Sequence, residues 1–489
     1  MSLMQDIFSI LQAGAASAMT TEQIIEQEIK DWLTSSQRSQ MLAGERYYKG
    51  DTDILQRVRT VVGEGGKLEP AKNLADNRLV HQFIRKLTDQ KVGYLLSKPI
   101  AIQTDNAKYQ ELLGDLFDKN TLRLLKNIGK EAINKGKAWV QVYYNPSGQL
   151  AFKKIPSEEI IPLWVDSAHT ELQAVIRTYD VTGYEGTTKK NLTKVEYWDT
   201  QGVKKYELVD GKLTPDMDQE SSQSHFSAIV DGVEQAYNWE RVPFICFKYN
   251  DEELPLIQFL KSLVDDYDKR KSDNSNNLED LPNSIFVIKG YDGTEAGELR
   301  KNLSTYRLIK VDGEGNSGVD TISLEIDTEA YKTHMEMNRK DIYEFGRGVD
   351  TSAKEFSSNA SGVALRSLYN DLDMDANTLE TEFQASLEQL CWFIDMHLIN
   401  SGQGDYTKEP VEFLFNRDIL INETDTITNV KNSVGILSQE TILANHPWVQ
   451  DAKEELKRVQ EEEQAAPDDP QGYGGLGKDK TPPEGGGTQ

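Results

Sequence analysis

One long apolar repeat constrains this chain more than any other feature of its sequence. Between residues 365 and 398, apolar residues recur at steps of three or four positions that sum to a repeat of eleven, close to the pitch of a straight α-helix. No Pro or Gly interrupts the repeat, whereas Gly362 precedes it and Gly402 follows it. The pattern therefore predicts one helix over 362–402. The repeating residues are Leu365, Leu368, Leu372, Ala376, Leu379, Phe383, Leu387, Leu390, Ile394 and Leu398.

A helix of this length would measure on the order of 50–55 Å, too long for one small domain. We expect it to span a large assembly or to pack against copies of itself. The chain has 489 residues, enough for about two to four domains. It carries 54 Lys and Arg against 80 Asp and Glu, a formal charge of −26. This excess of acid argues against a protein that coats nucleic acid but permits transient contact with DNA, and it also keeps a chain soluble.

The sequence gives no ground for an enzyme, a metal site or a cofactor. Cys246 and Cys391 lie among apolar neighbours and are expected to be buried thiols. The six histidines show no metal-ligand spacing, and no phosphate-binding loop, nucleophile elbow or zinc-protease motif is present. Two carboxylate clusters, Asp265-Asp266-x-Asp268 and Asp371-x-Asp373-x-Asp375, are interpreted as solvated helix faces. No apolar run of about 18 residues predicts a membrane span.

The first 250 residues read as helices followed by strands. Helical patterns cover 20–60, with Thr21 as the N-cap, then 77–96 and 109–134. Over 137–248 the pattern changes to short strands. The predicted fold class is therefore α+β.

A helix over Leu254–Leu281 opens the second half. Its first part has an apolar stripe, but Asp268–Asn277 is polar on every side. Two interpretations stay open: the helix faces a water-filled space, or it ends at Tyr267 and continues as a loop. Short strands punctuated by Gly fill 282–325, and Thr328–Phe345 is a second helix.

The segment Gly346–Ser361 connects this second helix to the long one. It contains a Gly-x-Gly sequence, but no Gly-Lys-Ser/Thr follows and no strand precedes it, so we do not expect it to hold phosphate. Its composition predicts a mobile loop, and such loops on rigid scaffolds often carry function. After the long helix, a strand at 411–415 and two helices are expected up to residue 463. Pro and Gly dominate 464–489, which predicts a disordered tail.

This order of elements resembles the portal proteins of long-tailed bacteriophages over nearly the whole chain up to the tail. Each local sequence mark is weak alone, and the order and spacing of the marks together carry the resemblance. The marks are Tyr47-Tyr48-x-Gly50 with Asp53-Ile54-Leu55, Asn77-Arg78 leading to Lys91-Val92-x-Tyr94-Leu95-Leu96-x-Lys98-Pro99, Val242-Pro243-Phe244, Asp265-x-Tyr267-Asp268 with Ser272-Asp273-Asn274 and Leu278-Glu279-Asp280, and Ser361-Gly362-Val363-Ala364-Leu365.

The resemblance implies a ring of about twelve subunits at one capsid vertex of the virion. Double-stranded DNA would be packaged and ejected through this ring, which would later connect head and tail. The implied partners are the terminase large subunit, a head-completion or adaptor protein, and the major capsid and scaffolding proteins. No membrane is involved, and assembly would take place in the host cytoplasm. The implied parts are an α+β wing (1–250), two stem helices (251–281 and 326–345), a small β-containing clip (282–325), a tunnel loop (346–361), a long wing helix (362–402) and a helical crown (403–463).

On this resemblance, candidate DNA-facing residues lie in the tunnel loop and on the polar half of the first stem helix. They are Arg347, Gly348, Thr351, Ser352, Lys354, Ser357 and Asn359 in the loop, and Lys269, Lys271, Asn274 and Asn277 in the stem. Each Lys or Arg that neutralises a phosphate adds affinity through counterion release, so a channel that lets DNA pass needs few of them. Two other classes stay open: a virion or scaffold oligomer without a DNA channel, and a hydrolase with an unfamiliar site.

Overall fold

The computed structural model describes residues 19–62, 66–71, 74–185, 188–216, 222–230, 232–280, 284–289, 308–311, 318–323, 328–352, 367–417, 423–446, 448–449 and 452–465. Its helices are α2 (Thr21–Leu33), α3 (Ser36–Tyr48), the 3-10 helix η1 (Asp53–Gln56), α4 (Phe83–Leu96), α5 (Ala107–Leu116), α6 (Lys119–Lys135), the 3-10 helix η3 (Ser157–Glu159), α7 (Leu256–Asp280), α9 (Thr328–Phe345), α11 (Asn370–Asn400), α12 (Glu423–Asn432), α13 (Gln439–Ala444) and α14 (Ala452–Ala465). Its strands are β1 (Thr60–Val62), β2 (Leu68–Pro70), β3 (Ala101–Gln103), β4 (Lys137–Tyr144), β5 (Leu150–Ile155), β6 (Ile160–Trp164), β7 (Leu172–Glu185), β8 (Thr188–Asp199), β9 (Gly202–Val209), β10 (Lys212–Pro215), β11 (Ser222–Gln223), β12 (Phe226–Val230), β13 (Val233–Tyr237), β14 (Phe244–Lys248), β15 (Ser284–Lys289), β16 (Leu308–Val311), β17 (Gly318–Ser323) and β18 (Glu412–Leu414).

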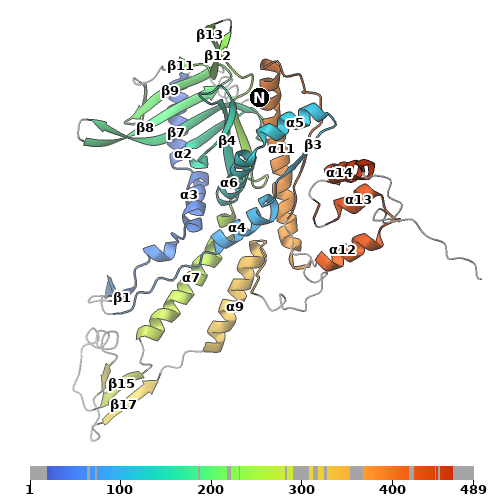
Figure 1. Ribbon diagram of the computed structural model, residues 1–489. Coiled ribbons are helices and arrows are strands. Elements are labelled where there is room, and N and C mark those ends of the chain that lie inside the picture. Colours follow the sequence, from blue (N-terminus) through green and yellow to red (C-terminus); the bar gives the residue numbers. More distant parts are fainter. Residues whose placement is uncertain are drawn as a thin grey trace, which may run out of the picture.

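Figure 1 shows one body of sheets and helices from which the helix pair α7 and α9 extends. The two helices pack against each other, and a small sheet lies at their far end. In that sheet β15 pairs in parallel with β16 and antiparallel with β17. Helices α12, α13 and α14 form a separate group on the side of α11 that lies away from β7 and β8 (Figure 1). The coarse α+β prediction is confirmed.

Two antiparallel sheets make up most of the strand-rich part of the body, beside the separate hairpin β12–β13. One has the order β14-β4-β5, and the other has the order β10-β9-β8-β7-β6, with β11 pairing with β9. Helix α2 covers the second sheet, because its Ile25, Ile29 and Trp32 join strand residues in one apolar cluster. Two short strands far apart in the sequence, β3 and β18, pair with each other.

The helical pattern over 20–60 becomes two helices and a short 3-10 turn. Thr20, and not the predicted Thr21, caps α2, and its side chain and that of Gln23 each accept a bond from the other's backbone N–H. Ser35 caps α3 by accepting from Arg38 N at 3.1 Å. The second predicted helix is also shorter than expected, because α4 begins at Phe83 and residues 77–82 are not helical.

The two long helices resolve two sequence predictions. Helix α7 continues unbroken to Asp280, so the interpretation that it ends at Tyr267 is wrong. Helix α11 spans 31 residues, about 46 Å, and every repeat residue from Leu372 to Leu398 is buried. The predicted start of this helix, residues 362–366, lies outside the described residues. Helices α4–α7, α9 and α11 share one apolar core with strands β4 and β14. Among the described residues, no helix is both long enough and apolar enough to cross a lipid bilayer.

Candidate functional site

An extended segment, residues 74–82, lies along one polar side of α7, and we call it the strap. Its backbone N–H groups at every second residue donate to α7 side chains at every fourth residue. The bonds run from Ala75 N to Asp280 Oδ1 (2.8 Å), Asn77 N to Asn276 Oδ1 (2.6 Å), Leu79 N to Ser272 Oγ (2.9 Å) and His81 N to Asp268 Oδ1 (2.9 Å).

The two periods match because of elementary geometry. Two residues of an extended chain advance about 6.6 Å, and four residues of an α-helix advance about 6 Å. Asp268, Ser272 and Asn276 are therefore fully covered, at 0%, 1% and 3% exposure. Asp268 also accepts from Thr52 Oγ1 at 3.1 Å. This side of the polar half of α7 faces the strap, so the interpretation that it faces a water-filled space is wrong for these residues.

Removing one acceptor of the strap tests this account. Asn276→Ala leaves the half-buried N–H of Asn77 without its partner, so we expect the free energy of unfolding to fall by about 1 kcal/mol. Asn277→Ala is the matched control, since Asn277 is exposed and a change there is expected to stay within about 0.5 kcal/mol. Urea denaturation measures both, and equal losses in the two variants would contradict the strap's role.

The first residues after α9 are held tightly to the rest of the chain. Gln90 of α4 accepts from Val349 N at 2.9 Å and donates to Val349 O at 3.0 Å. Arg339 of α9 binds both carboxylate oxygens of Asp350, at 2.6 and 2.8 Å. Although burial opposes it, bonds from Arg339 and Ser352 keep the pKa of the Asp350 carboxyl well below its ordinary value. These bonds fix residues 349 and 350 to α4 and α9. A mobile loop stays a prediction for the segment, of which residues 353–361 lie outside the described part.

Two glycines allow this close contact. A Cβ on Gly348 would lie 2.1 Å from Leu87 Cδ2, and one on Gly346 would lie 2.8 Å from Leu87 Cδ1. Between them Arg347 has a φ of +47°, a conformation that non-glycine residues rarely adopt. The Gly-x-Gly sequence therefore serves to press the chain against α4 and does not form a phosphate cradle.

A buried ion pair joins α4 to α11 beneath this segment. Lys91 Nζ lies 2.7 Å from Asp375 Oδ2 and donates to Arg347 O at 3.2 Å. Tyr249 OH donates to the same Asp375 carboxylate at 2.9 Å. Burial lowers the pKa of Lys91, and the Asp375 carboxylate opposes this effect. The cluster connects the strand-rich body, the long helix and the loop start at one point.

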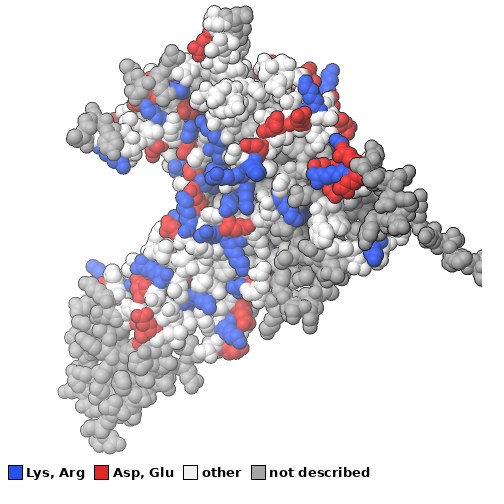
Figure 2. All heavy atoms as spheres, viewed as in Figure 1, with Lys and Arg blue, Asp and Glu red and all other residues white. Residues whose placement is uncertain are grey.

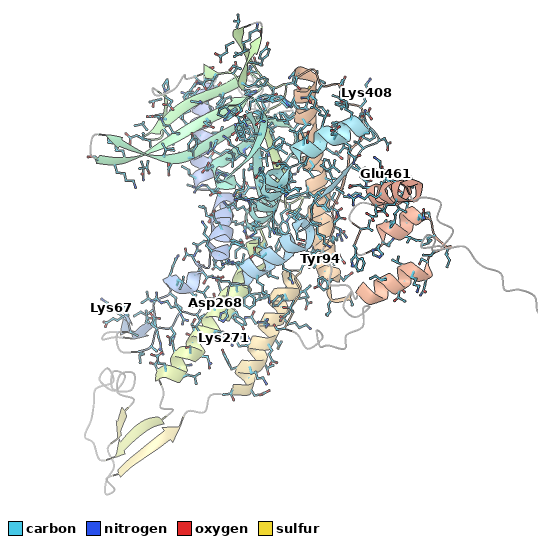
Figure 3. All side chains as sticks on the ribbon, viewed as in Figure 1. Lys67, Tyr94, Asp268, Lys271, Lys408 and Glu461 are labelled. Atoms are coloured by element: carbon cyan, nitrogen blue, oxygen red, sulfur yellow. The ribbon has the colours of Figure 1, made fainter. Side chains whose placement is uncertain are left out.

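The four predicted stem residues differ in their exposure to solvent. Lys269 and Asn277 are exposed on α7, whereas Lys271 and Asn274 are half-buried. Lys271 lies 5.8 Å from the ring centre of Tyr267 and 5.9 Å from that of Tyr331, which supplies cation–π contact. Figure 3 shows Lys271 and Asp268 on α7. These four residues do not share one side of the helix.

The predicted loop residues fall into two groups. Arg347 is half exposed and lies 3.9 Å from Asp375, Gly348 packs on Leu87, and Thr351 and Ser352 are exposed. Lys354, Ser357 and Asn359 lie outside the described residues.

The solvated-face interpretation of the carboxylate clusters is wrong for most of their members. Asp268 and Asp375 are buried, while Asp265, Asp266 and Asp373 bond to side chains of other elements, and Asp371 alone fits the prediction. No group of acidic, His or Cys side chains within the described ranges could hold a metal ion. Both cysteines are buried free thiols, as predicted, and burial raises the pKa of each to about 12.

A family model described as "Phage portal protein, SPP1 Gp6-like" matches residues 32–468. This chain belongs to that portal family. The portal protein of Bacillus phage SPP1 is 31% identical over 425 residues, covering 86% of this chain and 83% of that protein. The portal protein of Clostridium phage phiCD119 is 32% identical over 444 residues, covering 88% and 93%.

Membership in the portal family confirms the resemblance and makes the chain a structural protein of the phage capsid. Portal proteins of this family form a homo-oligomeric ring at the capsid vertex, where they serve in genome packaging and head–tail connection. The comparisons give no support to the alternative of an oligomer without a DNA channel.

Several of the sequence marks that carried the resemblance make side-chain contacts with one another or with nearby helices. Tyr47 OH of α3 donates to Asp265 of α7, and Asn77 Nδ2 of the strap donates to Glu279 near the end of α7 at 2.6 Å. Tyr48 OH joins α3 to Asp89 of α4 at 2.9 Å. Two of these contacts brace α7 at separate points along its length.

Proposed function

We propose that about twelve copies of this portal subunit close around an axial channel for double-stranded DNA, with α7 and α9 as the stem that surrounds it. The observation that carries the proposal is the helix pair itself, which extends from the body and ends in a small sheet (Figure 1). The strap fixes α7 to the body, and the ion pair between Arg339 and Asp350 fixes α9. The two helices together can therefore serve as a rigid wall of the channel.

The exposed side of α9 has the charge pattern that a passage for DNA requires. Exposed acidic and basic residues alternate along it at steps of three or four, which places them on one side of the helix. They are Glu329, Lys332, Glu336 and Lys340. Because no run of cations forms, few counterions would be released and DNA would be guided without being held. In the tunnel loop, Lys354 would be a single cation that guides DNA without holding it.

The other parts take their roles from this arrangement. Residues 1–250 together with the long helix would form the wing, and residues 282–325 the clip that meets the terminase large subunit and then the head-completion protein. Residues 346–361 would form the tunnel loop, and residues 403–463 the crown, near the major capsid and scaffolding proteins. Assembly would take place in the host cytoplasm. Hydrolysis of nucleotide belongs to the terminase motor, and this chain is expected to have no enzymatic activity.

A packaging assay with purified procapsids tests the tunnel-loop assignment. We expect Lys354→Ala to reduce packaged DNA only mildly, because one cation contributes one phosphate contact. Deletion of residues 348–358 is expected to abolish packaging while leaving the ring visible in electron micrographs. Full packaging by the deletion variant would refute the assignment, and projections of purified protein without a central hole would refute the channel.

A further inference from the structure

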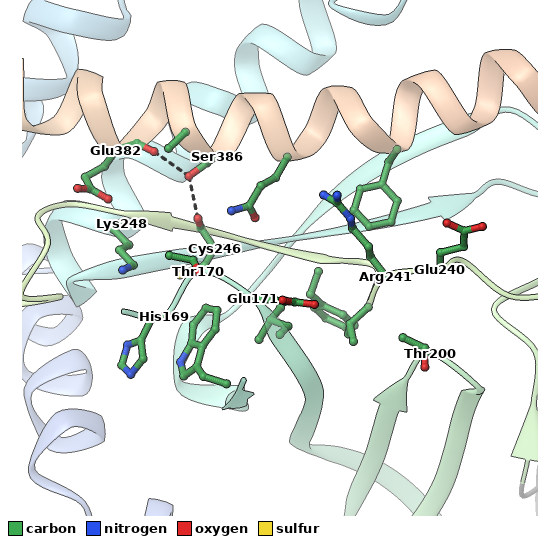
Figure 4. Close-up of a pocket in the computed structure, with 17 residues that line it drawn as sticks. His169, Thr170, Glu171, Thr200, Glu240, Arg241, Cys246, Lys248, Glu382 and Ser386 are labelled. Carbon is green, nitrogen blue, oxygen red and sulfur yellow. Dashed lines mark hydrogen bonds between the residues drawn. The ribbon is translucent and has the colours of Figure 1, made fainter. Parts of the chain in front are cut away.

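One side of the long helix α11 borders two open clefts that run end to end. The first has a volume of about 420 Å³ and lies between α11, β14 and the segments before β7 and β14 (Figure 4). The second, about 510 Å³, lies between α11, the chain just after β14 and the end of α9. The α11 residues that line them recur at steps of one to four and share one side of the helix: Asp375, Thr378, Glu382, Ala385, Ser386, Gln389 and Phe393. We call the two clefts together the α11 groove.

The α11 groove is acidic, with an apolar end. Its lining has six carboxylates against three cations: Glu171, Glu240, Glu252, Glu344, Asp375 and Glu382 against Arg241, Lys248 and Arg347. Asp375 is buried and already paired with Lys91, which leaves five carboxylates. All three cations are already engaged, since Arg241 stacks on Trp392 at 4.4 Å, Lys248 lies 3.7 Å from Glu253 and Arg347 lies 3.9 Å from Asp375.

Two features of the groove point to a missing occupant. Burial raises the pKa of the Glu382 carboxyl, and within the described part of the chain no cation lies within ion-pairing distance of it. At the apolar end Phe259 and Phe345 are 47% and 61% exposed, which is unusual for two neighbouring aromatic side chains at a cleft. A partner surface that carries cations and covers these two rings would therefore offset the excess negative charge and bury the exposed apolar surface.

A surface of the opposite charge lies elsewhere on the same subunit. Helices α4 and α6 pack together and present an outer face with six cations against two carboxylates: Arg85, Lys86, Lys119, Arg123, Lys126 and Lys130 against Asp89 and Asp118. Figure 2 shows Lys and Arg gathered across the middle of the molecule, the region of α4 and α6 in Figure 1. In a chain with a formal charge of −26, a face with this surplus of cations stands out. We call it the α4–α6 face.

On α4, the α4–α6 face points away from the long helix α11. Lys91 and Tyr94 of α4 bond to Asp375 and Asp373 of α11. Asp89 lies about half a turn of helix away from Lys91, so the exposed side of α4 points away from α11. A ring built from identical copies needs two different patches of this kind, which meet at every contact between neighbours.

We propose that the α4–α6 face of one copy docks along the α11 groove of the next copy. This inference rests on the ring of the proposed function and names the surfaces that close it. The cations of the face meet the groove carboxylates, and the neighbouring copy covers Phe259 and Phe345. The same pair of surfaces repeats at every junction, which makes ring closure dependent on salt.

Charge reversal on either side tests the contact. One variant carries Glu240→Lys and Glu382→Lys in the groove, a second carries Arg123→Glu and Lys126→Glu on the face, and a third combines all four. We expect each double variant to require at least tenfold more protein to form rings, and the combined variant to recover ring formation because each charge again meets its opposite. Light scattering and negative-stain images measure assembly, and circular dichroism checks folding.

A control variant and the pattern of outcomes distinguish a wrong contact from the absence of a ring. Lys189→Glu, at an exposed lysine of β8, should assemble like the unmodified chain. Double variants that form rings as readily as the unmodified chain, or a combined variant that fails to recover, would overturn the proposed contact while leaving the ring intact. Failure of the unmodified chain itself to form any ring would overturn the proposed function on which the contact rests.

Discussion

Replacing Lys91 by Met is expected to lower the free energy of unfolding by about 3–5 kcal/mol. The substitution leaves the Asp375 carboxylate buried with only the Tyr249 hydroxyl bonded to it and Arg347 at 3.9 Å. A buried charge that loses its partner keeps its desolvation penalty and loses the attraction that offset it. Urea denaturation of the unassembled subunit, followed by tryptophan fluorescence, measures the change.

The double variant Lys91→Met, Asp375→Leu provides the control. Removing both charges also removes the buried ion, so most of the lost stability should return. A loss in the double variant as large as in Lys91→Met would show that packing, and not the unpaired carboxylate, causes the effect. Because Lys91 also donates to Arg347 O, protease cleavage near residues 346–352 should increase in both variants.

Gly44→Ala is expected to destabilise the subunit by about 3 kcal/mol, at the upper end of the usual range for overpacking. An added Cβ would lie 1.8 Å from the backbone oxygen of Asn134 and 3.5 Å from Ile257. Since the obstacle is backbone of α6, it cannot swing aside as a side chain would, and α3 must move away from α6 and α7. A fall in the urea midpoint with an unchanged slope would report this loss.

Gly93→Ala is the matched control for the same chemical change. Gly93 lies in α4, and a Cβ there meets nothing within 4 Å. Alanine lowers the conformational entropy of the unfolded chain and favours helix, so this variant should gain about 0.5–1 kcal/mol. Stability changes of the same sign in the two variants would contradict the close contact assigned to Gly44.

The candidate site was only partly predictable because its contacts join distant parts of the chain. Gly346 and Gly348 suggested mobility, since composition reports what a segment could do when unpartnered. The structure instead presses them against Leu87, more than 250 positions earlier in the sequence. Lys91 and Asp375, likewise, show no local sign that they form one ion pair. The α7 side of the strap contact could have been predicted, because a polar residue recurs at every fourth position from Asp268 to Asp280. The strap itself could not, because its residues 77–82 fell within a predicted helix.

What the sequence determined by itself was local periodicity and its consequences. The eleven-residue repeat marked which side of α11 is buried, the change of pattern near Lys137 marked where strands begin, and the order of marks pointed to the portal family. Tertiary structure alone decided the environment of polar side chains. Asp268 and Lys271 are three positions apart in one polar run, yet one is sealed beneath the strap and the other lies between two tyrosine rings. Periodicity records which residues can be covered, whereas the covering segment is chosen by the packing of the whole chain.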